Sequence, residues 1–273
     1  MLLFLMFIDA GPQVIQTLSK SDDVRGVTLL NNELYVLRDR QNDQVDVYST
    51  ADFTLLSHLS IQGVSGRDTR DIASCVLKQC IYISDNGMIC IHRVGLDSSV
   101  SKWPVNGSPR GLSVMHSSNL LVTCGDWRGK DGKLLELSSD SGVCLREVQL
   151  EQDIEWPWHA VLLDNGLPPV LSYGTRANNS GLSHIGDDGR VRLTRNIMDG
   201  GLECPSHMAV DDNEFVFVAN AKKKDISLFD SSLIFVRYVT RHKQHEPQRL
   251  CFDDVTRRLY VGQSGGVVIV VQL

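Results

Sequence analysis

Two histidines occupy equivalent places in two similar stretches of the sequence, Pro-Trp-His-Ala-Val and Pro-Ser-His-Met-Ala-Val. Because imidazole nitrogens are common ligands of zinc and related metals, His159 and His207 are the strongest candidates for a metal site. A catalytic zinc uses three protein ligands, and the third would have to come from Asp71, His242 or His245. Asp71 is at the equivalent place but is not a histidine, and His242 and His245 lie elsewhere in their repeat. We therefore expect no metal and no cofactor.

Two other motifs resemble fragments of catalytic loops. Gly-Gln-Ser-Gly-Gly from Gly262 is similar to part of a nucleophile elbow, but that motif requires a strand-to-helix turn. The segment that begins at Gly125 contains glycine and lysine without the spacing of a phosphate-binding loop. No complete set of nucleophile, base and stabilising groups is visible, and we predict that the protein is not an enzyme.

Arginine and tryptophan recur at the position just before the histidine place in the similar stretches. These two residue types carry much of the binding energy in protein interfaces, so this position predicts a binding surface. Further basic and aromatic residues fall in loops that the fold would place nearby. The predicted partner-binding residues are Arg25, Arg70, Arg110, Trp158, Arg249, Arg38, Trp127, Arg128, Arg176, Lys222, Lys223 and Lys224.

These residues can meet only if the elements that carry them form a ring, and the sequence has the repeat that a ring needs. Each repeat reads as four short strands of four to seven residues, rich in β-branched and apolar side chains and separated by Asn, Asp and Gly turns. The aligned positions lie 45, 40, 48, 48 and 42 residues apart. They are Gly26, Asp71, Gly111, His159, His207 and Arg249.

A period of 40–48 residues with four strands is typical of a propeller blade. Six repeats predict an all-β, six-bladed β-propeller with blades that begin near residues 24, 69, 109, 157, 205 and 247. The last repeat has only three strands, and residues 14–18 form an apolar strand before the first repeat. Paired as the outer strand of the last blade, 14–18 would close the ring and cover an edge. Residues 13–273 are then one propeller, preceded by an apolar extension at 1–12.

The predicted binding residues gather on one side of such a ring. We call this side the top face: it carries the connections between blades and the loops between the second and third strands. The turns of the opposite face carry mostly Asp and Glu, which are common turn residues. We therefore place the partner on the top face.

The repeat at residues 205–230 carries a family resemblance. Its segments Pro-Ser-His-Met-Ala-Val-Asp, Phe-Val-Phe-Val-Ala-Asn and Ile-Ser-Leu-Phe-Asp resemble the NHL repeat. The Asn-x-Arg/His element of that family is replaced here by Lys222–Lys224 and Asp225. The cadence is similar to the C-terminal propeller of tripartite-motif proteins, which implies substrate recognition for a ubiquitin-ligase-type assembly. The RING, B-box and coiled coil of that family are not found in these 273 residues, so ligase activity is not carried over.

Charge favours one kind of partner over another. The net charge of -6 and the acids interleaved with the basic loops favour a protein or peptide over RNA, which is the second candidate. Our main prediction is thus a non-catalytic interaction module. A third candidate is a metal-dependent lyase or hydrolase with a channel site, as in propeller enzymes that the fold resembles. We expect no membrane contact and no small-molecule substrate.

Cysteine usage and the first residues bear on the compartment. The seven cysteines are odd in number and include no Cys-x-x-Cys pair, which favours a reducing compartment, and we predict the cytoplasm. The apolar run at the start is shorter than the ~20 residues that span a membrane. It also lacks the preceding basic residue of a secretory signal.

Overall fold

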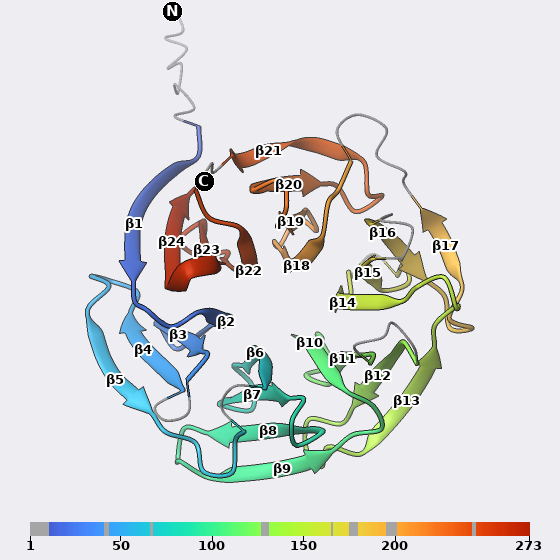
Figure 1. Cartoon of the computed structure of the whole chain (residues 1–273), viewed down its shortest axis with the longest axis horizontal. Coiled ribbons are helices and arrows are strands. Elements are labelled where there is room, and N and C mark those ends of the chain that lie inside the picture. The colour runs from blue at the N-terminus through green and yellow to red at the C-terminus, as the bar shows by residue number, and fades with distance from the viewer. Residues whose placement is uncertain are drawn as a thin grey trace, which may run out of the picture.

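A computed structural model describes residues 11–40, 44–65, 68–126, 131–164, 166–174, 180–194, 201–241 and 244–273. The strands in this part of the chain form six four-stranded antiparallel sheets, arranged around a central channel (Figure 1). The prediction of a six-bladed β-propeller is confirmed.

In the first five blades the strands run outward from the channel in chain order (Figure 1). The first blade holds β2 (Val24–Leu30), β3 (Glu33–Arg38), β4 (Val45–Ser49) and β5 (Leu55–Leu59). The second holds β6 (Thr69–Cys75), β7 (Cys80–Asp85), β8 (Cys90–Gly95) and β9 (Val100–Pro104). The third holds β10 (Pro109–Val114), β11 (Leu120–Cys124), β12 (Lys133–Leu137) and β13 (Cys144–Gln149).

The remaining blades follow the same order. The fourth holds β14 (Trp156–Val161), β15 (Val170–Gly174), β16 (Ser180–Ile185) and β17 (Val191–Thr194). The fifth holds β18 (Pro205–Val210), β19 (Val216–Asn220), β20 (Asp225–Phe229) and β21 (Phe235–Arg241). The sixth holds β22 (Pro247–Asp253), β23 (Arg258–Gln263), a short 3-10 turn η1 (Ser264–Gly266) and β24 (Val267–Gln272).

The ring is closed by the strand nearest the N-terminus. Strand β1 (Gln13–Ser19) pairs antiparallel with β24 as the outer strand of the sixth blade, which confirms the predicted closure. Lys20, just after β1, reaches across to the first blade and lies 3.1 Å from the Asp46 carboxylate. Arg38 donates to the same carboxylate and to the carbonyl of Gly266, so the closure joins the first and last blades by side chains too.

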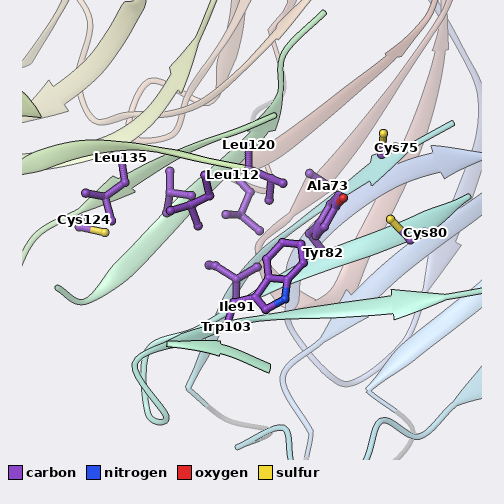
Figure 2. Packing of buried hydrophobic residues seen from close by; sticks show 12 residues of the cluster. Ala73, Cys75, Cys80, Tyr82, Ile91, Trp103, Leu112, Leu120, Cys124 and Leu135 are labelled. Carbon is purple, nitrogen blue, oxygen red and sulfur yellow. The ribbon is translucent and has the colours of Figure 1, made fainter. Parts of the chain in front are cut away.

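The core lies between neighbouring blades. In the second blade, Tyr82 and Trp103 pack with their ring centroids 5.6 Å apart (Figure 2). Leu112, Leu120 and Leu135 of the third blade belong to the same cluster. Middle strands such as β7 and β19 are buried along their whole length because blades cover both of their faces. That is why these strands read as unbroken apolar runs, whereas the outer strands carry exposed residues.

A bulge recurs in every inner strand. The pairing of the first strand with the second shifts by one residue or more between Val24 and Gly26, and at the equivalent place in β6, β10, β14, β18 and β22. A bulge leaves one residue out of the ladder and re-aims its side chain. The bulged residues include Arg25, Arg70, Arg110 and Trp158, and the residue after the bulge faces the channel.

Two further properties concern the whole described chain. All seven cysteines are free thiols. Within the ranges given above, no helix is long and apolar enough to cross a membrane.

Candidate active site in the channel

One residue from each inner strand faces the channel axis, and together these form the channel ring. Its members are Gly26, Asp71, Gly111, His159, His207 and Arg249. The two glycines make room for the larger four. A Cβ at Gly26 would lie 2.6 Å from a carbon of Ile72, and one at Gly111 would lie 2.5 Å from the carbonyl oxygen of Trp158. Side chains at these two positions would fill the space that Asp71 and His159 use.

Asp71 is the centre of the channel ring. Its side chain is 1% exposed. One oxygen accepts hydrogen bonds from the Leu112 amide at 2.9 Å and from His207 Nε2 at 3.1 Å, and the other accepts from its neighbour Ile72 at 2.9 Å. Arg249 Nε lies 3.7 Å from that second oxygen. One buried carboxylate therefore ties together four of the six blades.

The two histidines stack on each other. Their ring centroids are 3.7 Å apart and their planes differ by 28°. His207 Nδ1 accepts a hydrogen bond from the Leu250 amide at 3.3 Å, so the proton of the neutral ring is on Nε2, which donates to Asp71. His159 Nε2 donates to the Leu112 carbonyl at 3.0 Å, which leaves Nδ1 as an acceptor. That Nδ1 is buried and has no hydrogen-bond partner among the described residues.

Burial and charge fix the protonation of the cluster. Burial alone would raise the pKa of Asp71, but the interactions with His207, Arg249 and His159 outweigh it and lower the pKa. The carboxylate is therefore ionised at neutral pH. Burial lowers the pKa of His159 to about 3. His159 is thus a neutral imidazole with an unused lone pair.

Arg249 closes the upper side of the cluster. Its guanidinium donates to the carbonyls of Arg25 at 2.6 Å and Arg70 at 2.7 Å, and to Gln248 at 2.7 Å. These bonds hold the positive charge of Arg249 against Asp71 from across the channel. Burial lowers the pKa of Arg249, and the charges of Arg25 and Arg70 lower it further while Asp71 opposes them.

The cluster has the donor types of a metal site, but its arrangement does not fit a metal ion. Asp71, His159 and His207 each offer a ligand atom within 4.8 Å of the others. Two imidazoles that stack nearly parallel cannot both direct in-plane lone pairs at one ion. A metal-bound histidine donates its second N–H to an acceptor, whereas Nδ1 of His207 faces the N–H of Leu250. The guanidinium of Arg249 adds a repelling charge.

Below the channel ring lies the larger of two spaces in the channel. This lower cavity has a volume of about 620 Å³ and includes both histidines in its wall. Further along the inner strands its walls combine apolar side chains, such as Ile72, Leu112 and Leu250, with the hydroxyl side chains of Thr28, Ser74 and Ser113. The turns at its open end carry the acids Asp164, Asp211, Asp212, Glu214 and Asp254. Its volume is within the usual range for small-molecule sites, about 300–1,000 Å³.

Above the channel ring lies a smaller space, the upper pocket, of about 220 Å³. It gathers five of the residues predicted to bind a partner: Arg25, Arg70, Arg110, Trp158 and Arg249. The guanidinium of Arg110 lies over the Trp158 ring, 5.2 Å from its centroid. A recess of this size admits a small molecule and not a protein surface.

The other predicted partner-binding residues do not join this pocket. Arg38 is fully buried against Asp46, so it cannot contact a partner. Lys222, Lys223 and Lys224 lie in the β19–β20 loop and do not line either space. Trp127, Arg128 and Arg176, and the candidate ligand His242, lie outside the described residues.

The central role of Asp71 was not predicted. From the sequence, Asp71 was only one of three candidates for the third ligand of a metal site. The usable signal was its place in the aligned column, between two positions occupied by glycine. A charged residue flanked by glycines in a ring of inner strands has space on both sides and must find partners across the channel.

Comparisons with known proteins identify the fold and no family. No family model matches the chain, and no curated protein matches it. Three solved structures cover most of it: a catalytically inactive virginiamycin B lyase from Staphylococcus aureus with quinupristin, a hydrazine synthase from Kuenenia stuttgartiensis, and a gluconolactonase from Xanthomonas campestris. The lyase is 12% identical over 96% of this chain and 99% of its own, with a TM-score of 0.66.

The other two structures are as similar. The synthase is 12% identical over 89% of this chain and 82% of its own, with a TM-score of 0.69. The gluconolactonase is 14% identical over 95% of this chain and 94% of its own, also with a TM-score of 0.69. At this level of identity the likeness establishes the fold alone.

These findings correct three of our predictions. The non-catalytic interaction module, the absence of enzyme activity and the absence of a small-molecule substrate were wrong, because the similar structures are named enzymes whose substrates are small molecules. They favour the third candidate, a lyase or hydrolase with a channel site. What the comparisons and the geometry identify together is a six-bladed β-propeller.

Proposed function

We propose that this protein is a lyase or hydrolase that acts on a small molecule in the lower cavity, with His159 as the proton acceptor. One observation supports this most directly. His159 is part of the cavity wall, and its buried Nδ1 has no partner among the described residues. Buried polar nitrogens are almost always hydrogen-bonded, so a buried imidazole lone pair without a donor is a candidate for a functional group.

The other members of the cluster would support the proton transfer. The Leu112 carbonyl accepts a hydrogen bond from Nε2–H, which sets the tautomer that leaves the Nδ1 lone pair without a hydrogen. His207, held by Asp71 and the Leu250 amide, stacks on the ring and keeps its orientation. Asp71 lies 3.9 Å from His159 Nε2, and its negative charge stabilises the imidazolium that forms when Nδ1 takes a proton.

One base serves both classes of reaction. Removal of a proton next to a carbonyl begins an elimination, and removal of a proton from water produces the nucleophile of an ester or lactone hydrolysis. In the elimination a C–H of the substrate faces Nδ1, and in the hydrolysis an O–H of water does. Either one supplies the partner that Nδ1 lacks. The similar structures include one lyase and one lactonase, an example of each class.

The test uses the purified full chain and two probes. We expect turnover of glucono-δ-lactone, followed by acid release at constant pH, or of quinupristin, followed by mass spectrometry. General acid–base catalysis contributes roughly 10²–10⁴-fold, so His159→Gln should lower turnover at least about a hundredfold. His58→Gln changes a histidine on the outer strand β5 and should leave turnover unchanged. Equal turnover in both variants would refute the role of His159.

A chelator separates proton transfer from metal chemistry. We expect EDTA treatment to leave turnover unchanged, since the arrangement of the channel ring does not fit an ion. Loss of turnover in EDTA, with recovery on adding one divalent metal, would show that the histidines rearrange to bind that metal.

We also propose that the blades are NHL-type repeats and that the protein is in a reducing compartment. The residue pattern of 205–230 supports an NHL-type repeat, although the Asn-x-Arg/His element is absent. The seven free thiols support a reducing compartment such as the cytoplasm.

A further inference from the structure

We propose that the upper pocket binds a small oxyanion, a carboxylate or a phosphate group. This site lies on the opposite side of the channel ring from the lower cavity and does not depend on the reaction proposed there. Four arginines line it: Arg25, Arg70, Arg110 and Arg249. The acids in its lining are Asp71 and Glu246, so basic residues exceed acidic ones by two.

The arginines of the pocket are neutralised only in part. Arg25 forms an ion pair with Asp39, and Arg249 faces Asp71. Arg110 donates to the carbonyls of Gly125 at 3.0 Å and Asp126 at 3.1 Å, and the nearby Asp126 carboxylate offsets part of its charge.

Arg70 is the clearest free group. In the part of the chain that the structure describes, its guanidinium has no hydrogen bond and no ion pair. Arg25 Nε is likewise buried without a partner. Two of the arginines that line this pocket thus have donor groups without a partner in the described part of the chain.

The fold creates this crowding by a repeated device. Arg25, Arg70 and Arg110 are bulged residues of three neighbouring inner strands, so the same local distortion brings each side chain to the channel mouth. Burial lowers the pKa of Arg110, and the charge of Arg70 lowers it further while the Asp126 carboxylate opposes them. Like charges held together in a recess repel one another, and a bound anion relieves that repulsion. Guanidinium groups match the planar oxygens of carboxylates and phosphates.

The size of the pocket limits the ligand. Its 220 Å³ corresponds to about seven water molecules at the roughly 30 Å³ that each occupies in the liquid. This admits inorganic phosphate or a short dicarboxylate and excludes a polymer. Trp158, under Arg110, gives the pocket one flat apolar wall beside its charges.

The experiment is calorimetric titration with two probes, inorganic phosphate and malonate, at constant ionic strength set with sodium chloride. We expect saturable binding of at least one, and the comparison of the two identifies the preferred oxyanion. Arg70→Gln should weaken that binding at least tenfold. Arg237→Gln removes the same charge from the exposed outer strand β21 and should leave binding unchanged. No saturable binding of either probe, or equal binding by both variants, overturns the proposal.

Two further measurements keep the result independent of folding and of turnover. Without anion, Arg70→Gln should melt at the same temperature as the parent or higher, since the guanidinium has no partner among the described residues. A lower melting temperature would mean that Arg70 is structural and would overturn the proposal. His159→Gln should bind the anion as the parent does, because His159 does not line the upper pocket. Loss of binding in that variant would place the anion elsewhere and also overturn it.

Discussion

Replacing Asp71 by asparagine tests whether one carboxylate holds the centre of the propeller together. The change keeps the shape of the side chain and removes its charge. The Arg249 guanidinium, 3.7 Å away and 19% exposed, then loses its counter-ion. Removing one partner of a buried ion pair costs about 3–5 kcal/mol. Because Arg249 keeps three bonds to carbonyls, we expect the low end of that range for this part, about 3 kcal/mol.

The hydrogen bonds add to this cost. Asp71 accepts from three donors, and the amide nitrogen of asparagine would face at least one of them. An unsatisfied buried donor costs about 1–3 kcal/mol. We therefore expect Asp71→Asn to lower the free energy of unfolding by about 4 kcal/mol or more. The assay is the midpoint of urea unfolding followed by tryptophan fluorescence.

Asp225→Asn is the matched control. Asp225 is also buried, but it accepts only from Asn220 and Ser227, and no ion pair with it is present in the described ranges. Burial raises its pKa, the opposite direction from Asp71, so its charge is unfavourable and its removal should cost less than about 1 kcal/mol. Equal midpoint shifts in the two variants would refute the reasoning, as would a shift below about 1 kcal/mol for Asp71→Asn.

Two other predictions concern His159 and its surroundings. The pKa of His159 is about 3 in the folded protein and about 6.5 in an unfolded chain, so the unfolded state alone takes up this proton as the pH falls from 6.5. Stability should then decrease between pH 7 and pH 5, by up to about 1.4 kcal/mol per pH unit, and His159→Gln should remove this part of the slope in urea midpoints. Gly111→Ala would place a Cβ 2.8 Å from a ring carbon of His159 and 2.9 Å from its Cα. We expect a cost of about 1–3 kcal/mol and loss of lactone or quinupristin turnover, and a variant with parental stability and turnover would contradict the role given to the glycine.

The fold was predictable because its determinants are local and repeated. Each blade needs a middle strand buried on both faces, such as β19, and such strands show in the sequence as apolar runs bounded by turn residues. The regular spacing of these runs gave the number of blades. The three-strand last repeat required an outer strand from elsewhere, and β1 supplies it.

The site was predictable only in part, because it depends on contacts between distant residues. The alignment put His159 and His207 at equivalent places, but the stacking of their rings depends on backbone partners at Leu112 and Leu250 that no spacing reveals. Arg38 shows the opposite error. It is the last residue of the apolar strand β3, where a surface arginine is common, yet an ion pair with Asp46 eight residues later keeps it buried. The basic residues that were predicted to form one binding surface therefore lie in three places: the upper pocket, the buried Arg38–Asp46 ion pair and the β19–β20 loop.

The closure of the ring has a mechanical consequence. Antiparallel pairing puts Gln13 opposite Gln272 and Ser19 opposite Val267, so the two ends of the described chain leave the sixth blade side by side. A force that pulls these ends apart would act on the ladder one hydrogen bond at a time, beginning at Gln13, and would peel β1 from β24 as a zipper opens. The five other blades would carry none of that load until β1 is free. Tension along the chain would therefore open the ring at its seam while leaving the channel residues of the second to fifth blades in place.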